Sequence, residues 1–260
     1  MSRIIDFYKF IDKIAPFETQ ESWDNSGFQI KSGNPEIESI LVAMEINNDV
    51  IDEAIAKATK LIVTHHPLIF GGVKSVDDND ITGNYLIRLI SHGINVYSTH
   101  TPFDKCEGGN NDYLAKVLHL DDIQPMTEDE SGFCRVGFVD GECTAAEYIG
   151  QVCSWTGVDR QFVSFVGDPN AAVDKVGLCT GAGADFMKEA VAAGCDLFVT
   201  GDVKYHVAQT AKELGLNLLD LGHFGTENLF RDNMAEYLNN CGNNLKIFKS
   251  EVDLNPFVRI

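Results

Sequence analysis

The chain has 260 residues, of which 44% are hydrophobic and 23% charged, and 39 acidic against 20 basic residues give a net charge of −19. This composition is typical of a globular protein, and the length allows one large domain or two smaller ones. The acidic balance argues against non-specific nucleic-acid binding, which depends on Lys and Arg neutralising phosphates. An anionic substrate would therefore need local positive charge, which bound divalent cations can supply.

Cysteine usage and hydropathy indicate the cellular compartment. Seven cysteines are scattered along the chain without a C-x-x-C motif, so no secreted disulfide framework is predicted. The N-terminal segment lacks the features of a signal peptide, and no apolar run approaches the ~20 residues that span a bilayer. We expect a soluble, cytoplasmic protein that does not associate with membranes or nucleic acids.

The first expected elements are a helix and a turn. Residues 1–14 carry apolar side chains at helical spacing, with acids and lysines between them. The stretch "ESWDNSGF" (21–28) then has the composition of a turn. We expect Trp23 to lie in the core rather than in a site, and Asp24 or Asn25 either to orient a ligand or to cap a local element.

Two adjacent histidines follow a predicted strand. The apolar run "SILVAMEIN" (39–47) predicts one strand, and "EAIAKATKLIVT" (53–64) predicts a helix followed by a second strand that ends at His65 and His66. Because side chains alternate along a strand, these two rings would point apart if the strand continued. Pro67 argues against continuation, since it fixes φ and donates no hydrogen bond. A turn there would allow each ring to bind a different metal ion.

A third strand and an irregular stretch come next. "HGINVYSTH" (92–100) predicts a strand, and Asp104 follows it in "HTPFD". Between about 121 and 172, alternating apolar residues predict antiparallel strands in "SGFCRVGFVDG" and "RQFVSFVGDPN", with a helix over 144–155.

The remainder of the chain repeats the first part. "EAVAAGCDLFVT" (189–200) aligns with residues 53–64 without a gap, "DKVGLCTGAG" (174–183) takes the place of the first strand, and "LGLNLLDLGH" (214–223) resembles the third strand with one residue inserted. Each copy predicts alternating strands and helices with largely parallel, buried strands.

This repeat predicts an α/β fold made of two similar α/β halves that arose by internal duplication. We expect the first half to span residues 1–125 and the second 126–260, with roughly the last 30 residues able to pack back on the first half.

Two polar stretches of the second half permit more than one interpretation. The glycines of "CTGAGADF" (179–186) fit a plain tight turn better than a phosphate-binding turn, because the full G-x-G-x-x-G motif is missing. "TGDVKYH" (200–206) is either a solvated loop or a functional segment. In the second case Lys204 could contact a phosphate and His206 could transfer protons.

Five side chains that commonly bind metals follow predicted strands. They are His65, His66, Asp104, His223 and Glu227. Ligands gather beyond the carboxyl ends of parallel strands, and a duplicated fold can bring such ends together, so we predict a metal site between the two halves. His223 and Glu227 are spaced i, i+4, which places both on one face of a helical turn.

This donor set suits two divalent ions that activate water for hydrolysis. Three imidazoles and two carboxylates fit Zn, Fe, Mn, Ni or Co, and the residues do not distinguish between these metals. His100 and His206 are not needed as ligands and are the expected proton-transfer residues. The competing interpretation is structural, because a histidine at a strand end often only makes hydrogen bonds. His92 and His119 lack such neighbours and are expected on the surface.

Several motifs together resemble one family. "ESWDNSGF", "LIVTHHPLIFGG", "STHTPFD" with "GGNNDYLA", "TGDVKYH" and "LGLNLLDLGHFGTE" are similar, in the same order, to those of the GTP cyclohydrolase 1 type 2 homologue family, also called Ngg-interacting-factor-like proteins. The resemblance covers nearly the whole chain. Glu45 is a departure, since the family usually has Asp at that position.

The resemblance implies a dinuclear metal site whose five ligand positions match the five side chains named above without a substitution. It also implies a ring-shaped homohexamer, a trimer of dimers. We expect a metal-dependent hydrolase of a nucleotide or similar small molecule, with GTP as the candidate named by the family. The alternative is a non-catalytic ring that binds metal or a partner protein.

Overall fold

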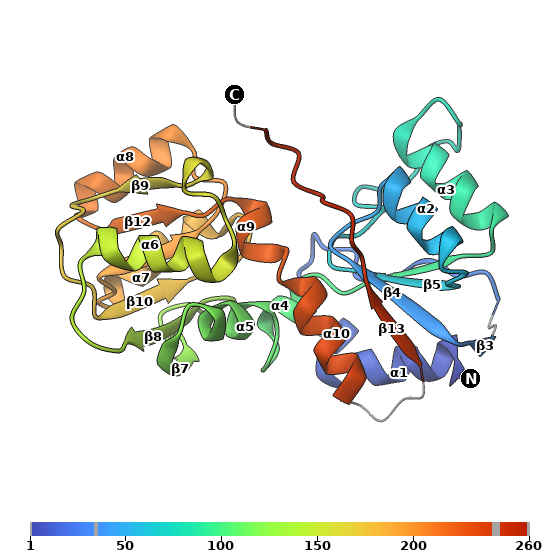
Figure 1. The fold of residues 1–260 in the computed structure, drawn as a ribbon, viewed down its shortest axis with the longest axis horizontal. Helices are drawn as coiled ribbons and strands as arrows, with labels where there is room; N and C mark the ends of the chain where they lie inside the picture. Colours follow the sequence, from blue (N-terminus) through green and yellow to red (C-terminus); the bar gives the residue numbers. More distant parts are fainter. Residues whose placement is uncertain (1, 34–35, 241–244, 259–260) are drawn as a thin grey trace. The chain divides into compact units, whose positions relative to one another are not determined.

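The computed structural model describes residues 2–33, 36–240 and 245–258. The chain forms two compact units, which are described separately (Figure 1). Unit 1 comprises Met1–Cys106 and Phe230–Leu254, and unit 2 comprises Glu107–Leu229 and Asn255–Ile260. Each unit has its own sheet with helices, which confirms the predicted α/β class. The division differs from the one expected at residue 125, because residues 107–125 belong to unit 2.

Unit 1 is built on a five-stranded sheet in the order β13-β4-β5-β6-β2, in which β2 alone is antiparallel to its neighbour. Its strands are β2 (Gly27–Ile30), β4 (Ser39–Ala43), β5 (Leu61–Thr64), β6 (Asn95–Ser98) and β13 (Lys246–Lys249), and β1 (Ser2–Arg3) pairs separately with β3 (Glu36–Ile37). The helices are α1 (Ile4–Ile14), η1 (Phe17–Thr19), α2 (Asn48–Ala56), α3 (Ile81–Ser91), α4 (Thr101–Lys105) and α10 (Phe230–Asn240).

The core of unit 1 follows from the alternation of side chains along its strands. Val42 and Val63 face α1 and α10, and they form one apolar cluster with Phe7 and Met234 of these helices. The intervening strand residues, such as Ile62, face the opposite way and are also fully buried. There α2 and α3 cover the sheet (Figure 1). Both faces of the parallel strands are therefore apolar, which is why their sequences read as continuous hydrophobic runs.

Unit 2 is built on a six-stranded sheet in the order β7-β8-β10-β11-β12-β9. Its strands are β7 (Leu120–Pro125), β8 (Arg135–Val139), β9 (Ser164–Val166), β10 (Lys175–Leu178), β11 (Leu197–Thr200) and β12 (Asn217–Asp220). The helices are α5 (Asn110–Val117), α6 (Ala145–Thr156), η2 (Arg160–Phe162), η3 (Gly183–Phe186), α7 (Met187–Ala192), α8 (Tyr205–Leu214) and α9 (His223–Glu227).

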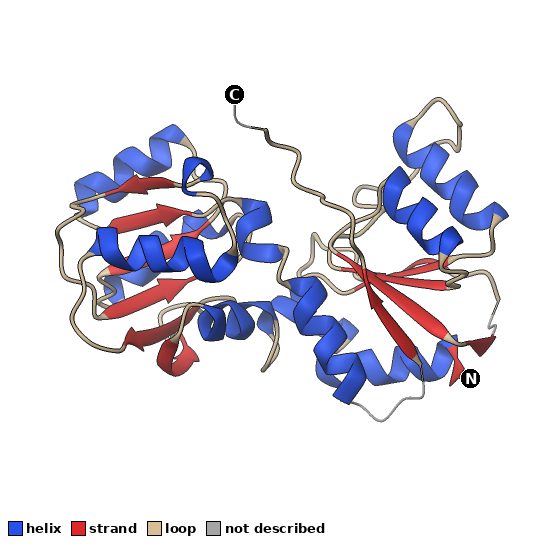
Figure 2. Cartoon of the chain, viewed as in Figure 1, coloured by secondary structure: helices blue, strands red, loops and turns tan. Residues whose placement is uncertain are grey.

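The middle of the chain folds as its residue pattern predicts. β8 is antiparallel to β7 and β10, and β9 is antiparallel to β12. α6 begins with a capping box in which Thr144 and Glu147 bond reciprocally, and it ends at Gly157, whose φ is 71°. Helices cover both faces of the sheet (Figure 2), since Val199 packs in the cluster with α6 and Phe198 in the cluster with α7 and α8.

The two sheets share the pairing of their three central parallel strands. Leu61 of β5 lies opposite Asn95 of β6, and Leu197 of β11 lies opposite Asn217 of β12. Residues 53–64 and 189–200 also have the same succession of helix, turn and strand. In both sheets the third parallel strand pairs with an antiparallel strand at the sheet edge. This edge strand is β2 beside β6 in unit 1 and β9 beside β12 in unit 2.

Asn95 and Asn217 make matching hydrogen bonds at the start of these third strands. Asn95 donates from Nδ2 to the Lys60 carbonyl (3.1 Å) and accepts at Oδ1 from the Ser32 N–H (2.7 Å). Asn217 donates to the Asp196 carbonyl (2.8 Å) and accepts from the Asp168 N–H (3.0 Å). Each asparagine therefore joins its third strand to the loops on both sides. Within the described residues, every helix is too short or too polar to cross a membrane.

Candidate metal centre

The backbone bends at the end of β5, which solves the geometric problem of two adjacent histidines. The N–H groups of His65 and His66 both donate to the carbonyl of Met44, at 3.1 and 2.9 Å. Two successive amides on one acceptor cannot belong to an extended strand, so alternation stops there. The carbonyl of His66 then accepts hydrogen bonds from the hydroxyls of Thr64 (2.9 Å) and Ser98 (3.2 Å). The two ring centroids lie 5.1 Å apart.

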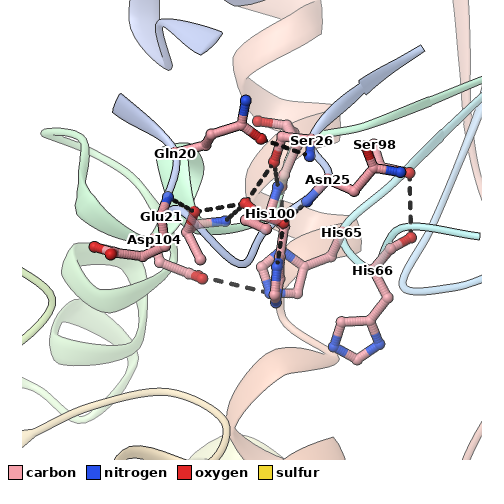
Figure 3. A network of polar contacts seen from close by, with 12 residues as sticks. Gln20, Glu21, Asn25, Ser26, His65, His66, Ser98, His100 and Asp104 are labelled. Atoms are coloured by element: carbon pink, nitrogen blue, oxygen red, sulfur yellow. Dashed lines mark hydrogen bonds and ion pairs between the residues drawn. The ribbon is translucent and has the colours of Figure 1, made fainter. Parts of the chain in front are cut away.

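Three histidines of unit 1 gather at this bend. One ring nitrogen from each of His65, His66 and His100 lies within 4.8 Å of the others, the spacing of donors that could share a metal ion. His65 is fully buried, while the other two are partly buried. Figure 3 shows the side chain of Asp104 directed at His65, where Oδ1 lies 3.6 Å from Nε2. Unit 1 therefore brings together three of the predicted ligands and one predicted proton-transfer residue.

The Nδ1 atoms of the three rings each have an oxygen partner outside the cluster. The partner of His65 is the Thr99 carbonyl (3.2 Å), that of His66 is Glu45 Oε2 (3.3 Å), and that of His100 is Asp24 Oδ1 (2.9 Å). Metal-bound imidazoles usually donate their other N–H to such a carbonyl or carboxylate. A carbonyl only accepts, so Nδ1 of His65 carries the proton and its Nε2 faces the carboxylate of Asp104 as a second acceptor. A cation or a proton bound by both atoms would satisfy this arrangement.

Asp24 fixes the ring of His100. Its side chain is fully buried and also accepts hydrogen bonds from the Thr101 N–H (3.1 Å) and the Ser26 hydroxyl (2.8 Å). Burial alone would raise the pKa of Asp24, but hydrogen bonds from His100, Thr101 and Ser26 outweigh burial and hold it well below its usual range. Because the ionised carboxylate only accepts, His100 donates from Nδ1 and, when neutral, keeps the lone pair of Nε2 available.

Unit 2 carries a histidine and a carboxylate on α9. Nε2 of His223 lies 2.8 Å from Oε2 of Glu227, and its Nδ1 lies 2.7 Å from Oδ2 of Asp202. Glu227 is 4% exposed, whereas the Asp202 side chain is 53% exposed. If Nδ1 donates to Asp202, Nε2 and Glu227 are again two acceptors in contact. An additional proton shared by the two atoms, or a metal ion bound by both, would remove this conflict.

Glycines near α9 provide the space for this pair. Gly181 has φ +63°, and a Cβ there would lie 2.2 Å from Oε1 of Glu227. A Cβ at Gly201 would lie 2.6 Å from the backbone nitrogen of His223. The glycines of "CTGAG" thus do more than form the tight turn expected from the sequence, because Gly181 allows the close approach of a buried carboxylate.

His206 and Lys204 lie elsewhere on unit 2. Both are exposed, Lys204 at the N-cap position of α8 and His206 in its first turn. Among the described residues, the His206 side chain has no hydrogen bond or ion pair. His92 and His119 are exposed, as expected.

The structure of the "ESWDNSGF" turn differs from one prediction and decides between the two roles predicted for Asp24. Trp23 was expected in the core but is 55% exposed, because the loop directs Asp24 inward and leaves the neighbouring indole outside. Of the two roles left open for Asp24, the structure favours orienting, since it holds His100. No local sequence signal indicates this role, because His100 lies 76 residues further along the chain. Glu45, the departure from the family pattern, contacts His66.

Comparisons with known proteins identify relatives over the full length. A family model described as Duf34/NIF3 (NGG1p interacting factor 3) matches residues 2–256. A curated protein of Clostridium perfringens named "GTP cyclohydrolase 1 type 2 homolog" is 36% identical over 230 residues, 86% of this chain and 87% of that protein. A hypothetical protein of Staphylococcus aureus has a similar crystal structure, with a TM-score of 0.92, 29% identity and 99% of both chains covered. A Bacillus cereus protein related to NIF3 shares the fold, with a TM-score of 0.94, 21% identity and coverage of 100% and 99%.

Proposed function

The chain belongs to the Duf34/NIF3 family, which confirms the predicted resemblance, and from this premise we propose that it binds two divalent metal ions and hydrolyses a nucleotide or a similar small molecule. The proposed ligands are His65, His66, Asp104, His223 and Glu227.

One observation supports this proposal most strongly. In each unit an imidazole Nε2 faces a buried carboxylate, His65 toward Asp104 and His223 toward Glu227, while Nδ1 has an oxygen partner on the other side of the ring. This is the arrangement of a metal-bound histidine with its supporting acceptor. Burying carboxylates in a chain of net charge −19 is also costly without compensating positive charge.

We propose that the two groups of ligands serve one dinuclear centre, as the family resemblance implies. Divalent ions held there would supply Lewis-acid polarisation of the bond to be cleaved. The protein would contribute His100 as the proton-transfer residue, with its tautomer set by Asp24. The same role for His206 stays a prediction.

Metal content tests the ligand assignment directly. Protein purified without added metal should contain two ions per chain by elemental analysis, and His65→Ala combined with Glu227→Ala should remove most of this metal. His92→Ala is the matched control, because His92 is an exposed histidine whose ring contacts its own helix. A double variant that retains its full metal load would overturn the assignment.

Hydrolysis requires a separate test. The metal-loaded protein should release product from GTP or a related nucleotide, and His100→Asn should lower the turnover while leaving the metal content in place. If no nucleotide is cleaved by protein with a full metal load, the non-catalytic metal- or partner-binding ring is the better description.

Two further proposals rest on likeness alone. We propose that the matching strand pairs and asparagines of the two units derive from an internal duplication. We also propose the homohexamer that the family resemblance implies. Light scattering of the purified protein measures its mass, and a monomer or dimer would contradict the hexamer.

A further inference from the structure

Unit 1 exposes two large aromatic side chains beside the three-histidine cluster. Trp23, in the loop before β2, is 55% exposed, and Phe70, in the loop after β5, is 53% exposed. Their ring centroids lie 6.1 Å apart and their planes differ by 29°, so the two rings form an offset aromatic stack. Adjacent exposed aromatic rings, unlike single scattered apolar side chains, are a candidate binding surface.

His100 contacts both rings of this aromatic stack. The His100 ring lies 5.7 Å from Trp23 and 5.8 Å from Phe70, inclined at 76° and 74° to their planes. The imidazole is therefore roughly perpendicular to both aromatic rings. The His100 ring also contacts the histidine cluster, with its centroid 5.0 Å from that of His65 and 5.7 Å from that of His66. His100 is thus shared by the aromatic surface and the histidine cluster.

Hydrogen bonds hold the two aromatic loops together. Ile69 directly precedes Phe70. The carbonyl of Ile69 accepts a hydrogen bond from Asn25 Nδ2 (2.5 Å), and the N–H of Ile69 donates one to Gln29 Oε1 (3.0 Å). Gln29 also donates to the Asn25 carbonyl (2.6 Å). Asp24, which directly follows Trp23, is fixed by hydrogen bonds to His100 and Thr101. The rings are therefore attached to anchored residues, which lowers the entropic cost of binding a ligand on them.

We propose that Trp23 and Phe70 form a stacking platform for the planar heteroaromatic ring of the substrate, a nucleobase, with the edge of that ring at His100. This names the substrate class of the proposed hydrolase and rests on that function. An exposed aromatic stack suits a base, because stacking is available to every base and needs no positive charge from this acidic chain. The perpendicular imidazole would limit how far the ring can slide toward the cluster.

Fluorescence isolates the platform. The chain has two tryptophans, so Trp155→Phe leaves Trp23 as the sole reporter, and Trp155 packs in unit 2 against His119 and Tyr148. Guanosine and adenosine should quench Trp23 saturably, and ribose should not. These probes carry no phosphate, so quenching is expected with and without bound metal.

Variants of the full chain measure the contribution of each ring. Trp23→Ala and Phe70→Ala should each weaken nucleoside binding by roughly 10- to 100-fold in calorimetry, since base stacking has this strength. Trp23→Phe should retain most of the affinity and Trp23→Leu should lose it, because leucine is apolar but not planar. Trp155→Phe is the control and should bind as wild type does.

The outcomes separate this proposal from the metal-dependent function. Metal content is measured in every variant, and unchanged metal with lost nucleoside binding supports the platform whether or not hydrolysis is found. Equal nucleoside affinity in wild type and Trp23→Ala would overturn it and leave the metal assignment standing. If Trp23→Ala changes the oligomeric state but not nucleoside affinity, the surface is an interface between copies of the chain and the proposal is wrong.

Discussion

Both units place a histidine beyond the third parallel strand and an aspartate at its Nδ1, but the two aspartates differ. Asp24 in unit 1 is fully buried and accepts from several donors, whereas the Asp202 side chain in unit 2 is 53% exposed and its residue has a φ of 55°. His100 is therefore fixed by a buried network, and His223 by an exposed contact. Similar strand patterns thus support sites of different rigidity.

The ends of the second strands differ as well. "THH" after β5 aligns with "TGD" after β11, so Gly201 takes the position of His65. A side chain is excluded there, because a Cβ on Gly201 would lie only 2.6–2.7 Å from backbone atoms of residues 222–223. Unit 2 therefore carries the proposed ligands His223 and Glu227 on α9, while unit 1 carries His65 and His66 at the strand end.

The largest expected difference between the units comes from removing the two aspartates. Asp24→Ala should lower the free energy of unfolding of unit 1 by about 3 kcal/mol, because it leaves buried donors without their acceptor. Asp202→Ala should cost unit 2 less than about 1 kcal/mol, since its contact is largely solvated. Urea unfolding followed by Trp23 or by Trp155, each as the sole tryptophan, reports one unit at a time. Equal losses of unfolding free energy in the two variants would show that His100 and His223 are held equally firmly.

The close approach of Glu227 to Gly181 can be tested against a matched glycine. Gly181→Ala should cost about 2 kcal/mol more than Gly194→Ala and should reduce metal content, because its Cβ would displace the carboxylate. Gly194 has a similar φ of +70° with nothing within 4 Å, so its substitution measures backbone strain alone. Equal stability and metal content in the two variants would show that Glu227 moves freely.

The two asparagines sharpen the likeness between the units. Asn95→Ala should cost about 2 kcal/mol and Asn217→Ala about 1 kcal/mol, since each loses two hydrogen bonds and only Asn95 is fully buried. Denaturant unfolding with the unit-specific tryptophans measures both. If only one of the two substitutions lowered the stability of its unit, Asn95 and Asn217 would not be structurally equivalent.

The smallest expected effect is the pH dependence that Asp24 gives to the stability of unit 1. The pKa of Asp24 is lowered in the folded protein, so its stabilising contribution is full above the unfolded-state pKa of about 3.9 and is lost as the pH falls below it. The stability difference between wild type and Asp24→Asn should therefore shrink below pH ~4, by at most about 1.4 kcal/mol per pH unit. A difference that is constant from pH 6 to pH 3 would argue against a depressed pKa.

Sequence periodicity predicted the strands and helices well, because buried parallel strands read as apolar runs and caps such as Thr144 are local. The clustering of His65 and His66 was also predictable, since Pro67 follows them. The role of Asp24 was not, because its partners are distant in sequence and a short polar residue in a turn has many uses. Trp23 was misjudged for a related reason: hydrophobicity indicates burial but does not say which residue of a tight loop faces inward.

The return of the chain to unit 1 has a consequence for biosynthesis. β13 completes the first sheet beside β4, and Phe230 places its ring 5.2 Å from His65, yet both are made only after all of residues 107–229. On the ribosome, unit 2 is a nearly continuous segment that can collapse first, while unit 1 waits for its C-terminal strand and helix. His65 therefore acquires its contact with Phe230 only near the end of translation. If the proposed metal ions bind, we expect them to bind the nascent chain late.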